Sequence, residues 1–398
     1  STLDRSSAAS DVYKRQNKIA IVSAKRTPIG RYKGRLSNYS AVELGTHALS
    51  AAMEAINLKP EDIENVIFGN VLQAGNGQNT ARQIGVAAGL PYTTPAMTVN
   101  EVCGSGLKAV ILGQQLIQLG QAKVVAVGGT ESMTNAPQLL LDDKETPVDS
   151  HMHDGLMDAF RQEPMGVTAE MVAEKYSITR EAQDEFANAS QHKAHEATEA
   201  GKFTNEIVPL EDVNGELMNT DEGIRANSNV EKLGTLKTIF KENGTVTGGN
   251  ASGINDGASA VILMELDYAK AQGYDILGVL GEYAEVGCEP DYMGYAPYYA
   301  VSQLLDKTNQ QLSDIDVIEM TEAFAAQSLA VKNNLSIPDD KLNLYGGAIA
   351  LGHPIGASGA RLVTTLVNIL NQEQQQSGIA TCCIGGGLGL ALHVKKGE

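Results

Sequence analysis

The sequence lacks the features that mark several classes of protein. Cysteine is scarce, with four residues in 398, two of them adjacent, so a disulfide-stapled secreted domain is excluded. No apolar run approaches the roughly 18 residues that a membrane-spanning helix needs. Acidic residues outnumber basic ones by 48 to 30, and the net charge of −18 disfavours nucleic acid and anionic lipid as partners. We therefore expect a cytoplasmic protein with no membrane and no nucleic-acid partner.

The first 17 residues have neither apolar periodicity nor the hydrophobic centre of a secretory signal. We predict that residues 1–17 are a non-native leader left by cloning or a shifted reading frame, and that the true start lies near Lys18. The chain is 42% hydrophobic, which suffices for a sizeable core, and it is long enough for two or three domains.

Two parts of the chain repeat one order of elements, in which a glycine-rich turn leads into a helix and a strand ends in glycines. The predicted elements are 18–24, 41–56, 65–68, 80–89, 96–101, 107–119 and 123–127 in the first part, and 277–286, 300–305, 316–320, 360–370 and 379–384 in the second. An internal duplication explains this order. Alternating strands and helices predict a layered α/β fold with mixed sheets.

The segment between the two halves has a different composition. Residues 130–270 are richer in methionine, histidine and charge, and they contain a predicted helix at 179–200. An insertion of this kind is usually a cap or a substrate-binding loop domain; the alternative is a third structural unit. We divide the chain into an N-terminal half at 18–129, completed by about 248–273, a loop insertion at 130–247, and a C-terminal half at 274–398.

Cys103 is the first candidate for chemistry. It lies where a predicted strand meets a helix, and Gly104, Ser105 and Gly106 let a ligand approach the backbone closely. A thiol at a helix N-terminus is shifted toward thiolate by the dipole and the unpaired N–H groups. The alternative is that Cys103 is a small buried hydrophobic residue.

His353 and Cys383 favour the catalytic interpretation. His353 lies in a turn rich in glycine and proline, and the duplication would bring this turn beside the one that holds Cys103. An imidazole can accept a thiol proton. Cys383 ends an apolar strand just before three glycines and can act on a second proton, whereas Cys382 is expected to point to the opposite face.

Other kinds of site find little support in the sequence. The Cys382–Cys383 pair has no second pair at zinc spacing, and His151 and His153 lack further ligands nearby. The GGNASG segment at 248–253 lacks the P-loop lysine and the spacing of a dinucleotide fingerprint. We therefore predict no metal site.

Five segments resemble the motifs of thiolases, in the order that the family has them. They are NEVCGSGLKAV (100–110), VTGGNASGINDGA (246–258), TEAFAAQS (321–328), GGAIALGHPIGASGAR (346–361) and CIGGGLG (383–389). The resemblance runs from about Lys18 to the C-terminus. It implies a thiolase-like α/β fold of two duplicated βαβαβαββ halves in five layers (αβαβα), with a loop domain over the site and a homotetramer or homodimer as the assembly.

The resemblance also implies acyl transfer between coenzyme A thioesters. The activity would be that of an acetyl-CoA C-acetyltransferase of fatty acid metabolism, which condenses two acetyl-CoA to acetoacetyl-CoA plus CoA and runs the reverse thiolysis. The thioesters are substrates, and no cofactor is implied. Two alternatives are a degradative 3-ketoacyl-CoA thiolase with broader chain length and a catalytically weakened CoA-binding homologue. Ketoacyl synthases share the fold but pair the cysteine with two histidines or with histidine and asparagine.

The site residues follow from the resemblance by position. Cys103 matches the nucleophile that accepts the acetyl group, His353 would activate it, and Cys383 would remove the α-proton of the second acetyl-CoA. The backbone N–H groups of Cys103 and Gly385 would form an oxyanion hole. The positions that match CoA and acyl contacts are Leu156, Met165, Arg225, Leu236, Phe240, Ser252, Met293, Ala323 and Phe324.

Charge and size add two details to these positions. Arg225, with Lys232 and Lys237, would supply local positive charge for the phosphates of CoA, although the two lysines also fit a solvated surface helix. Met293 matches a position that lines the acyl pocket, where a bulky side chain would favour short acyl groups.

The sequence departs from the family pattern at two places. The family usually has asparagine where this chain has Thr321, and that asparagine helps the histidine hold a water in an oxyanion hole. Threonine is shorter and lacks an amide donor, and loss of one oxyanion donor costs roughly 10²–10³ in rate. The second departure is Glu163-Pro164-Met165, where many relatives have a histidine before the methionine, and it implies a changed hold on the pantetheine arm.

Overall fold

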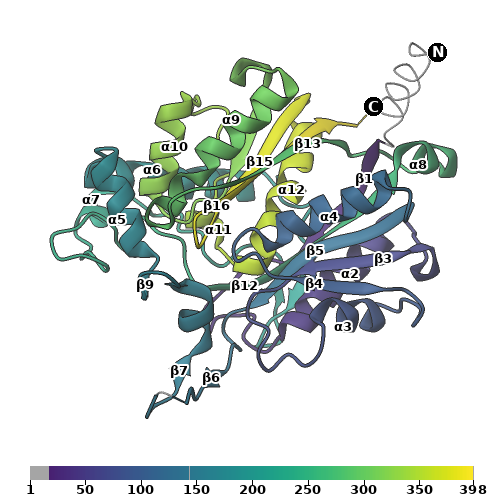
Figure 1. Cartoon of the computed structure of the whole chain (residues 1–398), viewed down its shortest axis with the longest axis horizontal. Coiled ribbons are helices and arrows are strands. Elements are labelled where there is room, and N and C mark those ends of the chain that lie inside the picture. The colour runs from purple at the N-terminus through teal and green to yellow at the C-terminus, as the bar shows by residue number, and fades with distance from the viewer. Residues whose placement is uncertain (1–17, 143, 398) are drawn as a thin grey trace, which may run out of the picture.

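Ten strands form one mixed sheet in the computed structural model, which describes residues 18–142 and 144–397 (Figure 1). The predicted leader, residues 1–17, lies outside the described residues. The strand order is β14-β15-β16-β13-β1-β12-β5-β3-β4, and β2 pairs with β12. The strands are β1 (Ile19–Arg26), β2 (Gly30–Arg31), β3 (Asn65–Gly69), β4 (Ala96–Val99), β5 (Val124–Ser132), β12 (Asn255–Glu265), β13 (Gly278–Gly287), β14 (Val317–Met320), β15 (Ser377–Ile384) and β16 (Leu388–Lys396).

The pairing pattern repeats in the two halves of the sheet, as a duplication predicts. In the N-terminal half β12 is antiparallel to β1 and β5, and β5 is parallel to β3. In the C-terminal half β16 is antiparallel to β13 and β15, and β15 is parallel to β14. The two half-sheets are hydrogen-bonded to each other because β1 pairs with β13, with Ile19 opposite Leu280.

Helices and half-sheets stack in five layers. Helices α4 (Ser105–Gln118) and α12 (Ile355–Gln372) pack together between the half-sheets, and their apolar side chains share one central core with the inner faces of the strands. The outer face of the N-terminal half is covered by α2 (Ala41–Glu54) and α3 (Thr80–Ala87), and that of the C-terminal half by α9 (Ala296–Thr308) and α10 (Ala325–Leu335). The predicted five-layer α/β fold is confirmed.

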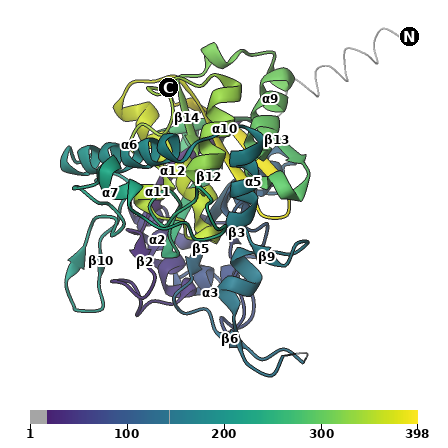
Figure 2. The same cartoon turned by 90° about the vertical axis from the view of Figure 1, so that its left-hand side faces the viewer.

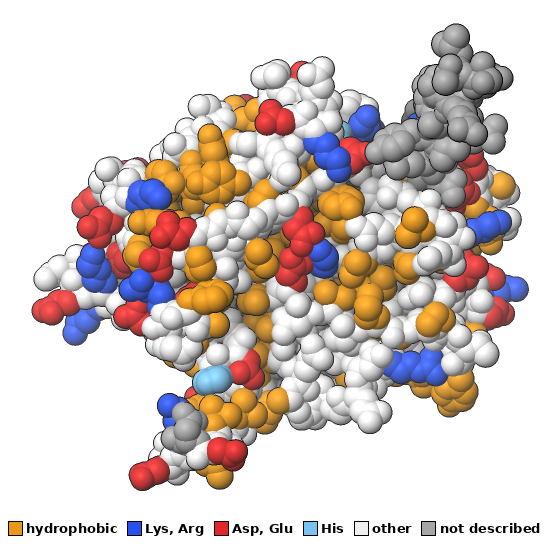
Figure 3. Space-filling view, in the orientation of Figure 1, with side chains coloured by type: hydrophobic (Ala, Val, Ile, Leu, Met, Phe, Trp, Pro, Cys, Tyr) orange, Lys and Arg blue, Asp and Glu red, His pale blue; other side chains and the backbone are white. Residues whose placement is uncertain are grey.

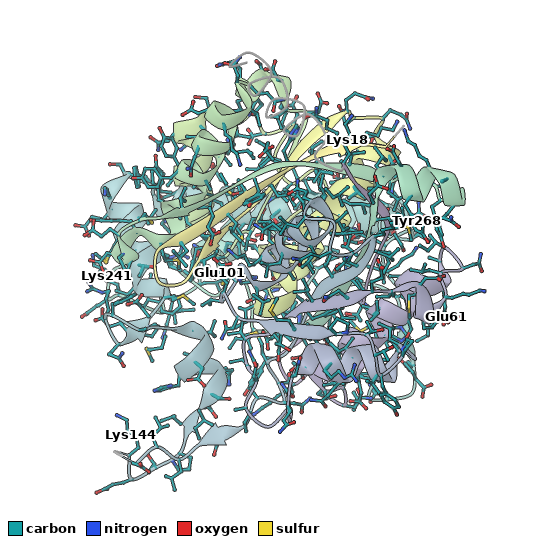
Figure 4. All side chains as sticks on the ribbon, turned by 45° about the vertical axis from the view of Figure 1, so that its right-hand side comes forward. Lys18, Glu61, Glu101, Lys144, Lys241 and Tyr268 are labelled. Atoms are coloured by element: carbon teal, nitrogen blue, oxygen red, sulfur yellow. The ribbon has the colours of Figure 1, made fainter. Side chains whose placement is uncertain are left out.

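The chain between β5 and β12 wraps one side of the molecule. Figure 2 looks onto this side, where α5 (Gly166–Lys175), α6 (Arg180–Glu199) and α7 (Val230–Gly234) lie in front of α12. A hairpin of β6 (Gln138–Leu139) and β7 (Val148–Asp149) projects from the body, with Lys144 at its tip (Figure 4). The remaining elements are β8 (Met157–Asp158), β9 (Glu163–Pro164), β10 (Leu210–Glu211), β11 (Leu217–Met218), α8 (Leu266–Gln272) and α11 (Ala348–Leu351).

A buried ion-pair cluster anchors this insertion to the sheet. The guanidinium of Arg26, at the end of β1, contacts Glu206 at 2.7 Å and both carboxylate oxygens of Asp221 at 2.7 and 2.9 Å. All three side chains are buried. Because removal of one partner would leave a buried charge uncompensated, the cluster holds the insertion in one position over the N-terminal half.

Most predicted elements exist, but strand β12 and helix α10 were not predicted, and further differences lie at turns. The strand predicted at 379–384 is not the last one, because Gly385–Gly387 form a hairpin turn that leads back into β16. The strand predicted at 96–101 ends at Val99, where the chain turns toward Cys103. Among the described residues, no helix combines the length and the apolarity that crossing a membrane requires.

Candidate active site

A cavity of about 360 Å³ is lined by residues of both halves and of the insertion, and Cys103, His353 and Cys383 all line it. Cys103 lies in the turn before α4, His353 in the turn before α12, and Cys383 near the end of β15. Because α4 and α12 pack against each other in the central layer, their two N-terminal turns meet at one place. The structure thus brings together three side chains that are far apart in the sequence.

The backbone before Cys103 is held in an unfavourable conformation. Val102 has a φ of 44°, in the left-handed region that β-branched residues rarely adopt. Its N–H donates to Asn100 Oδ1 at 3.0 Å, and its carbonyl accepts from Ser105 Oγ at 2.7 Å. The same hydroxyl accepts from the N–H of Glu101 at 2.8 Å. These bonds turn the chain sharply, so that Cys103 reaches the cavity at the start of a helix.

Burial, rather than the helix, decides the ionisation of Cys103. The residue is 5% exposed and packs against apolar side chains of Val71, Leu72 and Ile355. Desolvation raises the pKa of its thiol to about 12, although the backbone N–H groups of Gly385 and Cys103 itself oppose the rise. The expected shift toward thiolate is therefore wrong for the free protein, and Cys103 rests as a thiol that needs a base.

The imidazole of His353 is held in one orientation and one tautomer. Its Nδ1 lies 2.6 Å from Ser358 Oγ, and this hydroxyl donates to the carbonyl of Pro354 at 2.9 Å. The hydroxyl therefore accepts from Nδ1–H, which leaves Nε2 as an acceptor. Nε2 is buried and has no hydrogen-bond partner among the described residues. Burial, together with the charge of Arg361, lowers the pKa of His353 to about 4, so the imidazole is neutral near pH 7.

Of the two remaining candidate side chains, Cys383 lines the same cavity, whereas Thr321 does not. Cys383 is buried among Met165, Met293 and Ala323, and its pKa is raised by burial and by neighbouring Cys103. Thr321 follows β14 and is fully buried, and its hydroxyl has no hydrogen-bond partner among the described residues. The raised pKa favours the thiol form of Cys383, and the part of Thr321 in the reaction stays a prediction.

The chain is similar to known proteins over nearly its whole length. Models of the thiolase N-terminal domain and the thiolase C-terminal domain match residues 19–267 and 274–396. The chain belongs to the thiolase family. It is 47% identical to an acetyl-CoA acetyltransferase of Chromobacterium violaceum over 389 residues, which cover 95% of this chain and 99% of that protein. It is equally similar, over 390 residues, to a probable acetyl-CoA acyltransferase of Staphylococcus aureus, again covering 95% and 99%.

Solved structures agree with this thiolase in fold. The human mitochondrial 3-ketoacyl-CoA thiolase superimposes with a TM-score of 0.93 at 40% identity, covering 96% of this chain and 99% of that one. The acetyl-CoA acetyltransferase of Bacillus anthracis gives 0.93 at 38% identity, with the same coverage. A structure of the human protein in complex with CoA gives 0.92, covering 96% and 98%. The family resemblance of the five sequence motifs is thereby confirmed.

Most of the predicted CoA and acyl positions of this thiolase line the cavity. These are Leu156, Met165, Phe240, Ser252, Met293, Ala323 and Phe324. The rings of Phe240 and Phe324 meet edge to face with their centroids 6.1 Å apart. Gly385 lies beside a neighbouring cavity of about 330 Å³, which shares Met165 with the first. The lining is mainly apolar, which suits an acyl group and the pantetheine arm of a thioester.

The remaining predicted contacts lie outside this cavity. Arg225 and Leu236 are both exposed and do not line it. Lys232 and Lys237 are exposed as well, and basic side chains lie among acidic ones over the insertion at the left of Figure 3. A role for Arg225 in binding phosphate stays a prediction, and it would concern the part of CoA that lies outside the cavity and faces solvent.

Sequence reasoning missed several residues that shape the site. Ser358, which orients His353, lies in a glycine-rich motif where a small residue gives no catalytic signal. Val102 gave no signal because valine is typical of strands, and its residue type does not indicate the positive φ that it adopts here. The other missed lining residues are Met152, Pro164, Gly166, Ile239, Gly248, Ala251, Gly253, Ile254 and Ile355.

Proposed function

We propose that this thiolase is an acetyl-CoA C-acetyltransferase. It condenses two acetyl-CoA to acetoacetyl-CoA plus CoA, and it catalyses the reverse thiolysis, through an acetyl-Cys103 intermediate. The observation that carries the proposal is that Cys103, His353 and Cys383 line one mainly apolar cavity. The printed names of the relatives, acetyl-CoA acetyltransferase and acetyl-CoA acyltransferase, support it.

The first half-reaction uses Cys103 and His353. The Nε2 of His353 accepts the thiol proton, and the sulfur of Cys103 attacks the carbonyl carbon of acetyl-CoA. The N–H groups of Cys103 and Gly385, which point at the sulfur, stabilise the negative oxygen of the tetrahedral intermediate. The C–S bond to CoA then breaks, and His353 returns the proton to the leaving CoA sulfur.

The second half-reaction adds Cys383. Cys383 gives its own proton to Nε2 of His353, and the thiolate so formed, which burial makes a strong base, removes an α-proton from the second acetyl-CoA. The carbanion attacks the acetyl carbonyl on Cys103, a carbon–carbon bond forms, and Cys103 leaves as a thiolate. The proton on His353 passes to Cys103 and Cys383 keeps the α-proton, so both cysteines are thiols again, as at the start.

In this proposal Thr321 would act with His353 to stabilise the enolate oxygen in the second step. Both present a buried polar atom, Oγ1 of Thr321 and Nε2 of His353, that has no partner among the described residues. A water bound between them would supply the hydrogen bond that asparagine supports in related enzymes. The competing idea, a weakened CoA-binding homologue, depends on this threonine being unable to do so.

Met293 supports a short acyl substrate. Its side chain is buried beside Cys383 in the cavity lining, where its bulk would leave less room for a long acyl group. The alternative is a degradative 3-ketoacyl-CoA thiolase, the activity printed for the human mitochondrial structure. The test is a thiolysis series with 3-ketoacyl-CoA substrates of increasing chain length, with mass spectrometry of the acyl-enzyme.

We expect the highest kcat/KM for acetoacetyl-CoA, and an acetyl group on Cys103 that is absent in Cys103→Ala. A maximum at longer chains would select the degradative alternative. Absence of an acyl group on Cys103 would remove the proposed mechanism. Cys288→Ser is the matched control, because Cys288 is a half-buried thiol outside the cavity lining. A cytoplasmic homotetramer or homodimer stays a prediction, which light scattering of the purified protein tests.

A further inference from the structure

Glu131, near the end of β5, accepts hydrogen bonds with both oxygens of a fully buried carboxylate. Its Oε1 accepts from Asn70 Nδ2 at 2.8 Å and from the N–H of Leu72 at 3.1 Å. Its Oε2 accepts from the N–H of Val71 at 3.1 Å and from the N–H of Gly356 at 2.9 Å. Four donors satisfy the hydrogen-bonding capacity of one carboxylate. Because Glu131 is fully buried, water cannot replace a hydrogen bond that is lost.

These partners belong to both halves of the molecule. Asn70, Val71 and Leu72 follow β3 in the N-terminal half, whereas Gly356 lies in the first turn of α12, directly after the turn that carries His353. The approach is close, since a Cβ on Gly356 would lie 2.6 Å from Glu131 Oε2. The negative charge also faces the N-terminal end of α12, where the helix dipole favours it.

The same segments form the wall around the predicted nucleophile. Val71, Leu72 and Ile355 pack with Cys103 and Met133 in one apolar cluster. The backbone N–H groups of the first two donate to Glu131, and the third precedes Gly356, whose N–H also donates. One carboxylate therefore fixes both the wall beside the sulfur and the turn that carries the base.

We propose that Glu131 is a positioning residue for acyl transfer. It fixes Val71 and Leu72, which pack beside Cys103, relative to the turn that carries His353, where the two halves of the molecule meet. The inference rests on the proposed function and adds to it a residue that neither touches substrate nor lines the cavity. A shift of about 1 Å between nucleophile and base can cost about 10²-fold in rate. Rigid attachment of both segments to one carboxylate prevents such a shift.

The charge of Glu131 has a second consequence for Cys103. Accepting four hydrogen bonds requires the ionised carboxylate, since a protonated oxygen would point a hydrogen at an N–H donor. Burial and Asp256, on adjacent β12, raise the pKa of Glu131 to about 7, and the backbone donors oppose this rise. The negative charge in turn helps to raise the pKa of the Cys103 thiol. Burial is the main cause of that raised pKa, and the charge of Glu131 adds a smaller rise in the same direction.

The test compares Glu131→Gln with Glu131→Asp. Glutamine keeps the size but turns a donor toward the N–H groups that need an acceptor, and it removes the charge. We expect Glu131→Gln to lower kcat for acetoacetyl-CoA thiolysis by about 10²-fold, with little change in KM for CoA. We also expect iodoacetamide to alkylate Cys103 at lower pH than in the wild type. Aspartate keeps the charge but shortens the reach, so its kcat falls while the alkylation profile stays near that of the wild type.

Glu170→Gln is the matched control. Glu170 is also a buried glutamate that accepts from backbone N–H groups, those of Thr245 and Val246, but it lies on α5 outside the cavity lining. The proposal is overturned if Glu131→Gln keeps the wild-type kcat. It is also overturned if the variant loses activity while its alkylation profile stays that of the wild type, because a merely destabilised protein would behave in that way. If Glu131→Gln does not fold, wild-type kcat in Glu131→Asp overturns it equally. Alkylation of Cys103 needs no turnover, so these results are separable from failure of the acetyltransferase assignment.

Discussion

Cys382 and Cys383 are consecutive in β15, yet their side chains lie in two separate hydrophobic clusters. Cys382 is buried in the central core with residues of α4 and α12, whereas Cys383 lies beside Met165 and Met293 in the cavity. Side chains alternate between the two faces of a strand, so Cys382 packs in the core and Cys383 lines the cavity. The predicted orientation of the pair is confirmed.

This relationship gives a test with an internal control. We expect Cys383→Ala to reduce condensation by about 10²–10⁴-fold, the range for loss of an acid–base group, while acetyl-Cys103 still forms from acetyl-CoA. Cys382→Ala should keep its activity and lose about 1 kcal/mol of unfolding free energy, because it removes one buried atom. Intact-protein mass spectrometry and denaturant unfolding measure both effects. Loss of acetyl-Cys103 in Cys383→Ala would contradict the assigned division of labour.

The lowered pKa of His353 predicts how the free energy of unfolding depends on pH. Its pKa is lowered from 6.5 to about 4 in the folded protein. Between these values the unfolded chain binds a proton that the native state does not, so this residue makes the free energy of unfolding fall as the pH drops from 6.5 toward 4. His353→Asn should show a shallower fall over that window. His393, whose pKa is lowered to about 4 as well, is present in both proteins and cancels in the comparison.

Parallel urea titrations at several pH values measure this difference. The same slope in the wild type and in His353→Asn would show that the imidazole is not held neutral by burial. The activity of the variant supplies a second readout, because loss of the base should abolish acetyl-Cys103 at neutral pH.

Substitutions at Thr321 test whether its hydroxyl takes part in the reaction and whether the lack of an amide at this position limits the rate. Thr321→Val keeps the shape and removes the hydroxyl, so we expect kcat to fall by about 10²-fold if the group supports the enolate. Thr321→Asn restores the residue that is usual in the family and should raise kcat if threonine limits the chemistry. Steady-state condensation rates measure both. Unchanged kcat in both variants would mean that Thr321 has no part in the reaction.

Met293→Ala should enlarge the space beside Cys383. We expect the preferred 3-ketoacyl-CoA to become longer, with a loss of about 2–5 kcal/mol in unfolding free energy for a buried methionine. Leu304→Ala, on α9, is the control, since it is buried in the outer core away from the cavity. It should destabilise the protein without changing the order of preference. An unchanged chain-length order in Met293→Ala would remove the size argument for short substrates.

The local features of the site could be predicted from the sequence. Glycine-rich turns before two helices placed Cys103 and His353 at equivalent positions of a repeated pattern, and alternation along one strand separated Cys382 from Cys383. These features depend on residues near in the chain, where backbone freedom and side-chain period are readable. The strand β16 was missed because the glycines before it signalled an end, whereas in the sheet they make a turn between two antiparallel strands.

The sequence by itself determined the family, most of the alternating elements and the three side chains Cys103, His353 and Cys383 that line the cavity, because each depends on a short motif. Only the tertiary structure decided how those groups ionise and what holds them together. Burial overrides the helix at Cys103 and keeps His353 neutral, and Glu131 joins segments from both halves through four hydrogen bonds. Desolvation and contacts between distant segments arise only when the chain packs, so no local pattern can specify them.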